Sequence, residues 1–292
     1  MIAVVTGRRR EKYDERPTPP YLLNKDCSQA QGLVAFWPLG EILPTLYFDY
    51  VRGRGSGPFN LTQTGTMTRA VGPFGQGLAT SNTGVTTNYL SVSSTPVTAT
   101  PITCACWIYP FSISTYWNAW NSVQTGLDDY FNLYINNPGN GVIGASTSTT
   151  AAGEAIASAT GSLVANQWQH ACVVWTSATL RAAYRDGWNK GTNTTSRTPS
   201  GLDAMNVGIY PGGFGPLNGR LAHLCIWNRA LTDDEVFELY EPPTRWDLYY
   251  PTGRKTYSIG APAAGGRTTR NTLASPLGMH LGRGLWTHGG SG

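Results

Sequence analysis

Apolar residues along this chain gather in short runs of four to eight residues, and glycine, proline, asparagine and threonine separate the runs. Runs of this length with such boundaries predict β-strands. At least eight such runs predict an antiparallel sandwich or barrel. The expected strands cover residues 32–38, 89–92, 102–109, 130–135, 169–175, 180–185, 206–210 and 220–227.

One segment near the end of the strand series predicts a helix. Thr232 and Glu235 form the T-x-x-E pattern of a capping box, in which each side chain bonds the other residue's backbone N–H. Val236 and Leu239 lie three apart and give the helix one apolar face. Pro242 ends it. We therefore expect one short C-terminal helix that packs on the strands.

The two ends of the chain differ in composition from the middle. Residues 1–31 carry six basic and four acidic residues, and residues 251–292 carry five basic residues and no acid. The whole chain has 13% charged and 11% aromatic residues. This aromatic content argues against disorder of the whole chain. We divide the chain into an extended N-terminal arm (1–31), a folded body (32–242) and an extended basic C-terminal tail (243–292).

The tail carries large apolar side chains but no pattern from which it would build its own core. Such residues, spaced through glycine, proline and threonine, predict docking onto another surface. The expected docking residues are Trp246, Tyr249, Tyr250, Tyr257, Leu277, Leu281 and Trp286.

Cysteine usage and the N-terminus both bear on location. Five cysteines lack metal-binding spacing, and an odd number leaves one unpaired, which favours a reducing site of synthesis. The first residues do not follow the pattern of a secretory signal. No apolar run reaches the length that crosses a membrane. We expect a protein made in a cytoplasm, with no membrane partner.

The segment 218–240 (NGRLAHLCIWNRALTDDEVFELY) resembles the last strand and closing helix of laminin-G-like, concanavalin A-like jelly-roll domains. The resemblance covers about residues 32–242. It implies an all-β fold, a two-sheet antiparallel jelly-roll sandwich with one short C-terminal helix. Four further stretches agree with this family in order and spacing: 32–40, 102–110, 166–175 and the hairpin turn Asp186-Gly187.

Members of this family often bind calcium or sugar through acids and aromatic residues in loops. Asp49 lies where such members place an aspartate, although the asparagine-rich loop around it is missing here. The strand 219–227 carries Ala222 and His223 where acids are common. We expect no cofactor, and Asp49 remains the single calcium candidate.

Glycosidases of this architecture need two carboxylates that face one cleft. On a strand, this requires acids at i and i+2 or i+4. The acids of the body outside the helix and its flanks show no such pair, and no serine-hydrolase, zinc-protease or P-loop motif occurs. We therefore expect no enzymatic activity, and keep a glycosidase as the least favoured alternative.

An aromatic segment that we expect to be a loop, followed by acids, suggests a ligand site. Aromatic faces stack on sugar rings, and carboxylates accept hydrogen bonds from hydroxyl groups. The same residues also suit a protein interface, because tryptophan and tyrosine dominate such surfaces. The candidate glycan-binding residues are Tyr116, Trp117, Trp120, Asp128 and Asp129.

Similar laminin-G-like modules with proline- and aromatic-rich tails occur among phage structural proteins. The resemblance thus implies a virion protein, either a capsid decoration (minor capsid) or a head-fibre protein. Its partners would be the major capsid protein or other virion subunits, including copies of itself, and five bases spread over the tail argue against nucleic acid. The alternative is a carbohydrate-binding adhesin or tail-tip receptor-binding protein with a cell-surface glycan as partner.

Overall fold

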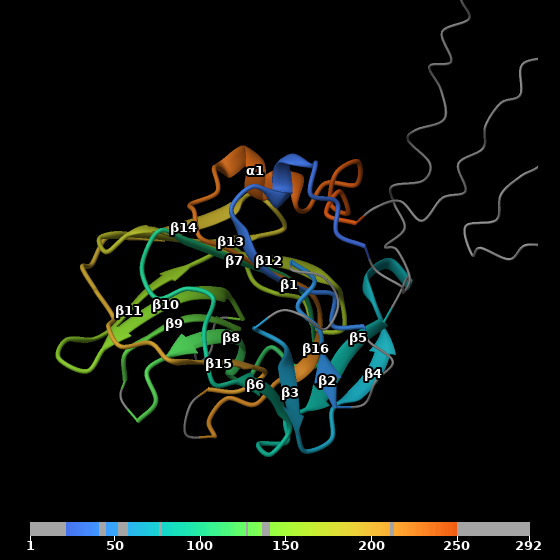
Figure 1. Ribbon diagram of the computed structural model, residues 1–292, viewed down its shortest axis with the longest axis horizontal. Helices are drawn as coiled ribbons and strands as arrows, with labels where there is room; N and C mark the ends of the chain where they lie inside the picture. Colours follow the sequence, from blue (N-terminus) through green and yellow to red (C-terminus); the bar gives the residue numbers. More distant parts are fainter. Residues whose placement is uncertain are drawn as a thin grey trace, which may run out of the picture. The chain divides into compact units, whose positions relative to one another are not determined.

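Two antiparallel sheets of eight strands each face one another in the computed structural model (Figure 1). The structure describes residues 22–249 except 41–44, 52–57, 76–77, 127, 136–140 and 211–212. The chain divides into two units, Met1–Thr252 and Gly253–Gly292, and every described residue belongs to the first. The predicted all-β antiparallel sandwich is confirmed.

The first sheet has β16 at its centre, where one half of the strand pairs with β5 and the other half with β1. In spatial order its strands are β14 (Asn189–Asn193), β13 (Leu180–Arg185), β12 (Gln169–Ser177), β7 (Ile102–Pro110), β16 (Asn218–Trp227), β5 (Leu78–Thr83) and β4 (Thr68–Val71). The eighth strand, β1 (Leu33–Trp37), pairs with β16 on the same side as β5.

The second sheet holds strands of two to seven residues. In spatial order they are β11 (Gly153–Ser158), β10 (Ile143–Thr149), β9 (Tyr130–Ile135), β8 (Trp117–Val123), β15 (Ala204–Val207), β6 (Tyr89–Val92), β3 (Leu61–Thr64) and β2 (Leu46–Tyr47).

The predicted hairpin and helix are both present. Asp186, Gly187 and Trp188 form the turn that connects β13 to β14, and Asp186 and Gly187 both have positive φ. Helix α1 (Asp233–Glu238) begins with the complete capping box of Thr232 and Glu235. Two short 3₁₀ turns, η2 (Ser28–Ala30) and η3 (Pro73–Gly75), complete the described elements.

One core lies between the sheets. Side chains alternate along each strand, so Cys104 and Cys106 of β7 point inward to meet Leu133 of β9 and its neighbours in the same cluster. Trp120 of β8 and Trp175 of β12 meet across this core with ring centroids 6.1 Å apart. This core holds the two sheets together.

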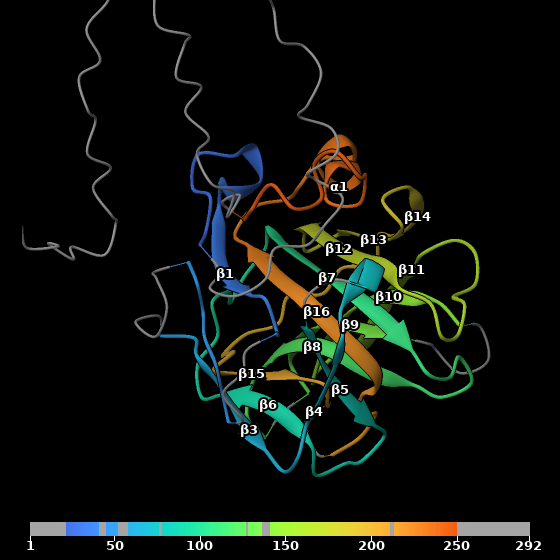
Figure 2. The same ribbon diagram turned by 90° about the vertical axis from the view of Figure 1, so that its right-hand side faces the viewer.

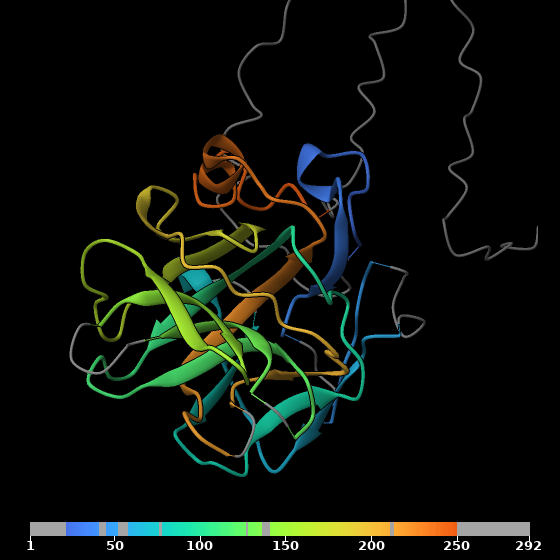
Figure 3. The same ribbon diagram turned by 90° about the vertical axis from the view of Figure 1, so that its left-hand side faces the viewer.

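A second core covers the outer face of the first sheet. The alternate residues of β7, Ala105 and Trp107, point outward and are buried beneath α1 and both ends of the described chain. We call this covering layer the terminal cap and define it as residues 22–31, α1 and residues 239–249. Figures 2 and 3 show η2 and α1 on the same side of the sandwich.

Hydrogen bonds join the two ends of the described chain within the terminal cap. Leu23 and Tyr249 form an antiparallel bridge, and the Asn24 N–H donates to the Leu248 carbonyl at 2.9 Å. The Trp227 indole N–H donates to the Gln29 carbonyl at 2.7 Å. The packed unit therefore extends beyond the predicted limits of 32–242, on both sides.

His170 is a buried titratable group under the terminal cap. Its side chain is 1% exposed and packs on Trp107 with ring centroids 5.3 Å apart. Burial lowers the pKa of His170 to about 3 from its ordinary 6.5. At pH 7 the imidazole is therefore neutral in the folded protein.

This histidine predicts a loss of stability on mild acidification. Below pH 6.5 His170 is protonated in the unfolded chain but stays neutral in the folded chain. Its contribution to the free energy of unfolding is therefore complete above pH 6.5 and decreases as the pH falls toward 3. We expect His170 to contribute a loss of about 1 kcal/mol between pH 7.5 and 5.5. Urea unfolding at both pH values measures it. His170→Gln should flatten this dependence whatever its effect on stability at pH 7.5, and an unchanged slope would contradict the assignment.

Among residues 22–249, outside the gaps given above, no helix combines the length and apolar character that a membrane span needs.

Candidate functional site

The outer face of the second sheet is the best-formed candidate site. Strand β9 alternates there between apolar residues that point into the core and tyrosine or asparagine residues that point out, and β10 and β11 follow it in the sheet. Tyr130 pairs with Ser148, which in turn pairs with Glu154. The register thus places a tyrosine and a carboxylate on either side of a strand of small side chains.

Two glycines make room for tyrosine rings to lie across the sheet. A Cβ on Gly144 of β10 would lie 2.1 Å from Cζ of Tyr134, so only glycine permits this ring position. A Cβ on Gly215 would lie 2.5 Å from the ring of Tyr116. The rings of Tyr116 and Tyr134 contact each other with centroids 5.4 Å apart.

These rings enclose a hollow of about 360 Å³. Tyr130 and Tyr210 meet edge-on in it, with centroids 5.2 Å apart, and Phe214 is 69% exposed. We call it the tyrosine hollow. Its lining residues are Tyr116, Tyr130, Tyr134, Glu154, Ile156, Tyr210 and Phe214.

Glu154 is the charged residue of the tyrosine hollow. Its Oε1 accepts hydrogen bonds from the Tyr130 hydroxyl at 3.1 Å and from the Ser146 hydroxyl. Both hydroxyl groups donate to the same carboxylate oxygen. The carboxylate is therefore fixed in position while Oε2 accepts no hydrogen bond from the described residues.

The tyrosines of the hollow remain protonated at neutral pH. Burial raises the pKa of Tyr116 to about 12, and burial also raises the pKa values of Tyr130, Tyr134 and Tyr210. The negative charge of Glu154 acts in the same direction on all four. Each phenol therefore keeps its O–H donor and its uncharged ring.

A second hollow adjoins the first and shares Tyr210 with it. This threonine hollow, of about 350 Å³, brings hydroxyl groups and one amide together. Tyr210 thus borders both spaces and occupies the middle of the combined site. The lining residues are Thr64, Thr86, Thr87, Tyr89, Asn206, Ile209, Tyr210 and Gly213.

Buried asparagines support the site from beneath. The Asn132 amide donates to the Tyr116 hydroxyl, which donates to Asn118 Oδ1, both at 3.3 Å. The Asn206 amide donates to Asn121 Oδ1 at 3.1 Å, and Asn121 donates to the Ile209 carbonyl at 2.7 Å. These bonds fix Tyr116 and the segment that leads to Tyr210.

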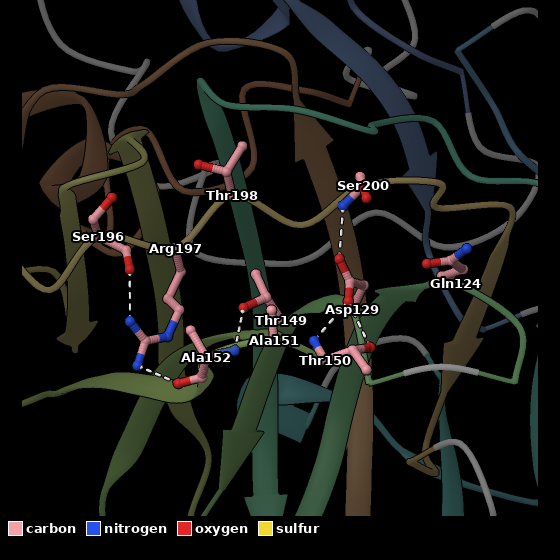
Figure 4. Close-up of a pocket in the computed structure, with 10 residues that line it drawn as sticks. All are labelled: Gln124, Asp129, Thr149, Thr150, Ala151, Ala152, Ser196, Arg197, Thr198 and Ser200. Carbon is pink, nitrogen blue, oxygen red and sulfur yellow. Dashed lines mark hydrogen bonds between the residues drawn. The ribbon is translucent and has the colours of Figure 1, made fainter.

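A third, more open space of about 520 Å³ lies at the end of the sheet, where two hairpin turns meet the segment 196–200 (Figure 4). Asp129 holds this end together by accepting the N–H and hydroxyl of Thr150 on Oδ1 and the Ser200 N–H on Oδ2. Arg197 donates to the carbonyls of Gly153, Ala152 and Ser196. Both charged side chains therefore use their hydrogen bonds to hold the surrounding loops in place.

The pKa of Asp129 follows from these contacts. Burial acts to raise it, but hydrogen bonds from Thr150 and Ser200 outweigh burial and leave the pKa below its usual value. The aspartate is ionised at neutral pH as a structural clamp. This engagement makes the end space a weaker ligand site than the tyrosine hollow.

The structure separates the five predicted glycan-binding residues. Tyr116 lines the tyrosine hollow, Asp129 borders the end space, and Asp128 is exposed beside it. Trp117 and Trp120 have no exposed surface. They were expected in a loop but lie in β8, where a bulge between Asn118 and Trp120 turns both indoles into the core. Neither offers a ring face to a ligand.

The predicted docking residues divide between the cap and the undescribed tail. Trp246 and Tyr249 are each 3% exposed and belong to the second core, so in this chain they pack on its own first sheet. The Tyr249 hydroxyl meets His223 Nδ1 at 2.9 Å. The remaining predicted docking residues, Tyr250, Tyr257, Leu277, Leu281 and Trp286, lie outside the described residues.

Asp49, the calcium candidate, is buried beside β1. Its Oδ1 accepts the backbone N–H groups of Phe36 at 3.1 Å and Val51 at 3.0 Å. Within the described part of the chain, no three His, Cys, Asp or Glu side chains gather as a metal site would require.

Six of the seven residues that line the tyrosine hollow escaped the sequence analysis: Tyr130, Tyr134, Glu154, Ile156, Tyr210 and Phe214. A signal was present for two of them, because the strand 130–135 (YFNLYI) alternates tyrosine and asparagine with apolar residues. Glu154 and Tyr210 carried no such signal. They reach the hollow only because β11 pairs with β10 and the segment after β15 brings Tyr210 against Tyr130 of β9.

A laminin-G family model described as the concanavalin A-like lectin/glucanases superfamily matches residues 82–237. No curated protein sequence matches the chain. Among solved structures, domain 4 of AbnA, a GH43 extracellular arabinanase from Geobacillus stearothermophilus in complex with arabinotriose, is similar. Its TM-score is 0.57 at 17% identity, over 72% of this chain and 98% of that domain.

Two toxin domains share the same fold. The binding domain of Paraclostridial mosquitocidal protein 1 has a TM-score of 0.57 at 12% identity, over 73% of this chain and 52% of the other. The receptor-binding domain of botulinum neurotoxin type G has a TM-score of 0.53 at 8% identity, over 72% and 51%. This chain thus spans about half of each toxin structure, and the likeness concerns the fold.

Proposed function

The chain belongs to the concanavalin A-like lectin/glucanases superfamily, and we propose that it is a non-enzymatic glycan-binding protein whose site is the tyrosine hollow. One observation carries the proposal: Glu154 is fixed among four tyrosine rings and keeps one carboxylate oxygen free of described partners. The arabinotriose complex of the AbnA domain and the binding roles in the names of the two toxin domains support it.

The chemistry of the two hollows suits a sugar chain. Tyrosine presents an apolar ring together with a hydroxyl group, so it can cover a sugar face and hydrogen-bond at its edge. Glu154 Oε2 accepts from ligand hydroxyls, and the threonine hollow adds hydroxyl donors and acceptors. Tyr210 borders both hollows, which gives room for more than one sugar unit.

The same geometry favours binding without hydrolysis. Glycoside hydrolysis by the usual route takes two carboxyl groups about 5 to 9.5 Å apart. Glu154 is the one carboxylate among the residues that line the tyrosine hollow, and none lines the threonine hollow. We therefore propose that the site holds a glycan without cleaving it.

Tyr210→Ala tests the site. Removing the ring that borders both hollows is expected to weaken glycan binding about tenfold, the effect of losing one central aromatic contact. A glycan array on the full chain identifies the ligand, and titration calorimetry with that ligand compares the variant with the parent.

Trp188→Ala is the matched control. Trp188 is 57% exposed and packs on Phe237 of α1, within the opposite layer of the molecule. It should bind as the parent does. A blank array, or equal affinity of the Tyr210 variant and the parent, would overturn the proposal.

We further propose that this module belongs to a virus particle, as a capsid decoration or head-fibre protein. The position of the terminal cap supports it. Leu23 and Tyr249 pair on the outer face of the first sheet, and the tyrosine hollow lies on the outer face of the second. The two ends of the described chain thus lie on the side opposite the proposed glycan site, which suits display from a surface.

On this proposal the partners are the major capsid protein or other virion subunits, including further copies of the chain. The contacts would come from residues beyond Tyr249, because Trp246 and Tyr249 are already buried against the first sheet. A chain that ends at Thr252 tests the role of the tail, as set out below.

A further inference from the structure

We propose that the tyrosine hollow selects its glycan by charge, preferring a sugar with a protonated amino group and rejecting carboxylated sugars. This inference rests on the proposed function, since it names the ligand class of the same site. It starts from the charge inventory of the lining: one carboxylate, from Glu154, and no lysine or arginine.

Arg197, a basic group that contacts β11 next to Glu154, does not compensate this charge. Arg197 donates to the Gly153 carbonyl next to Glu154 in sequence, but its other donors go to the carbonyls of Ala152 and Ser196 in the end space. A second acid, exposed Asp128, acts on Tyr210 with the same sign as Glu154. The field in the hollow is therefore negative.

The position of the carboxylate prepares it for a cation. Tyr130 and Ser146 hold Oε1, and Oε2 remains available on an exposed residue. A protonated amine donating to Oε2 would form a charge-assisted hydrogen bond, which is stronger than the bond from a neutral hydroxyl. A ligand carboxylate at the same place would meet repulsion instead.

The rings around Glu154 act in the same sense. An aromatic face carries partial negative charge and attracts a cation within about 6 Å of its centroid. Four uncharged tyrosines and Phe214 line the hollow, so an ammonium group beside Glu154 would lie among ring faces and edges. A hydroxyl or an acetamido group is uncharged and therefore has no cation–π attraction to these rings.

The experiment compares three oligosaccharides of equal length: glucosamine oligomers, N-acetylglucosamine oligomers and galacturonic acid oligomers. Binding to the full chain is measured by calorimetry at about pH 6, where the amine is protonated. We expect the glucosamine oligomer to bind about tenfold tighter than its acetylated counterpart, and the galacturonic acid oligomer to bind weakest. Added salt should narrow the gap.

Glu154→Gln keeps the shape of the residue and removes its charge. It should bring the affinities of the glucosamine and acetylated oligomers, both measured on this variant, to the same value. Asp234→Asn, which removes an equal charge from exposed α1 on the other side of the sandwich, should leave the preference intact. This control separates a local effect from the overall charge of the protein.

The outcomes separate the two proposals. Equal or tighter binding of the galacturonic acid oligomer, or an amine preference that survives Glu154→Gln, overturns the charge inference. Binding of neutral glycans without any amine preference overturns the inference and leaves glycan binding in place. No binding on an array that contains neutral, amino and acidic glycans overturns the proposed function itself.

Discussion

Ending the chain after Pro242 is expected to lower the free energy of unfolding by about 5 kcal/mol or more, because the second core loses three large side chains. Trp246, Leu248 and Tyr249 are each at most 3% exposed and cover the outward face of the first sheet. Truncating one buried large side chain typically costs about 2 to 5 kcal/mol. Urea unfolding and thermal melting measure the loss.

The control is a chain that ends after Thr252 and so keeps the whole first unit. It should unfold with the same midpoint as the full chain. If the particle proposal holds, this folded chain should also fail to incorporate into particles, since it lacks the tail. Normal incorporation would contradict tail docking, and a stable chain ending at Pro242 would contradict the structural role of the terminal cap.

Trp120→Ala is expected to cost about 4 kcal/mol of stability. The indole is fully buried between the sheets and packs on Trp175. Adding Trp117→Ala should approach the total stability of a typical domain, about 5 to 15 kcal/mol, so that the double variant unfolds at or near room temperature. Circular dichroism and urea unfolding provide the measurement.

This result distinguishes a core role from a ligand role. Tyr116→Phe, in the adjacent position, keeps the ring and removes a hydroxyl that borders the hollow, so it should change binding far more than folding. A double tryptophan variant that folds normally and loses only glycan binding would contradict the inward orientation of both indoles. It would restore the interpretation of this segment as a sugar-binding loop.

The candidate site was predictable only in part. Tyr116 was identified because aromatic residues cluster in sequence around it, but the cluster also contained Trp117 and Trp120. A strict alternation would place Trp117 and Trp120 on opposite faces; the bulge within β8 places both in the core. A bulge changes the face of every later residue in its strand, and the local sequence gave no sign of where it falls.

The strands, too, could be predicted from the sequence only in part. The apolar strands β7, β9, β12, β13 and β16 were predicted from their runs, since burial of both faces or one face leaves a readable pattern. Polar strands such as β3, β4 and β14 were not, because residues such as Thr, Gln, Asn and Lys carry no apolar period. They are strands because neighbouring strands supply their hydrogen-bond partners.

Local sequence is sufficient to specify the all-β class, the hairpin at Asp186-Gly187 and the capped helix that begins at Asp233. Each depends on residues a few positions apart, and local preferences are sufficient to specify it. Long-range packing places Trp246 and Tyr249 on the protein's own sheet and brings tyrosines from three separate segments around Glu154. Periodicity tells which side chains share a face of a strand, but not what covers that face. That depends on how distant segments pack.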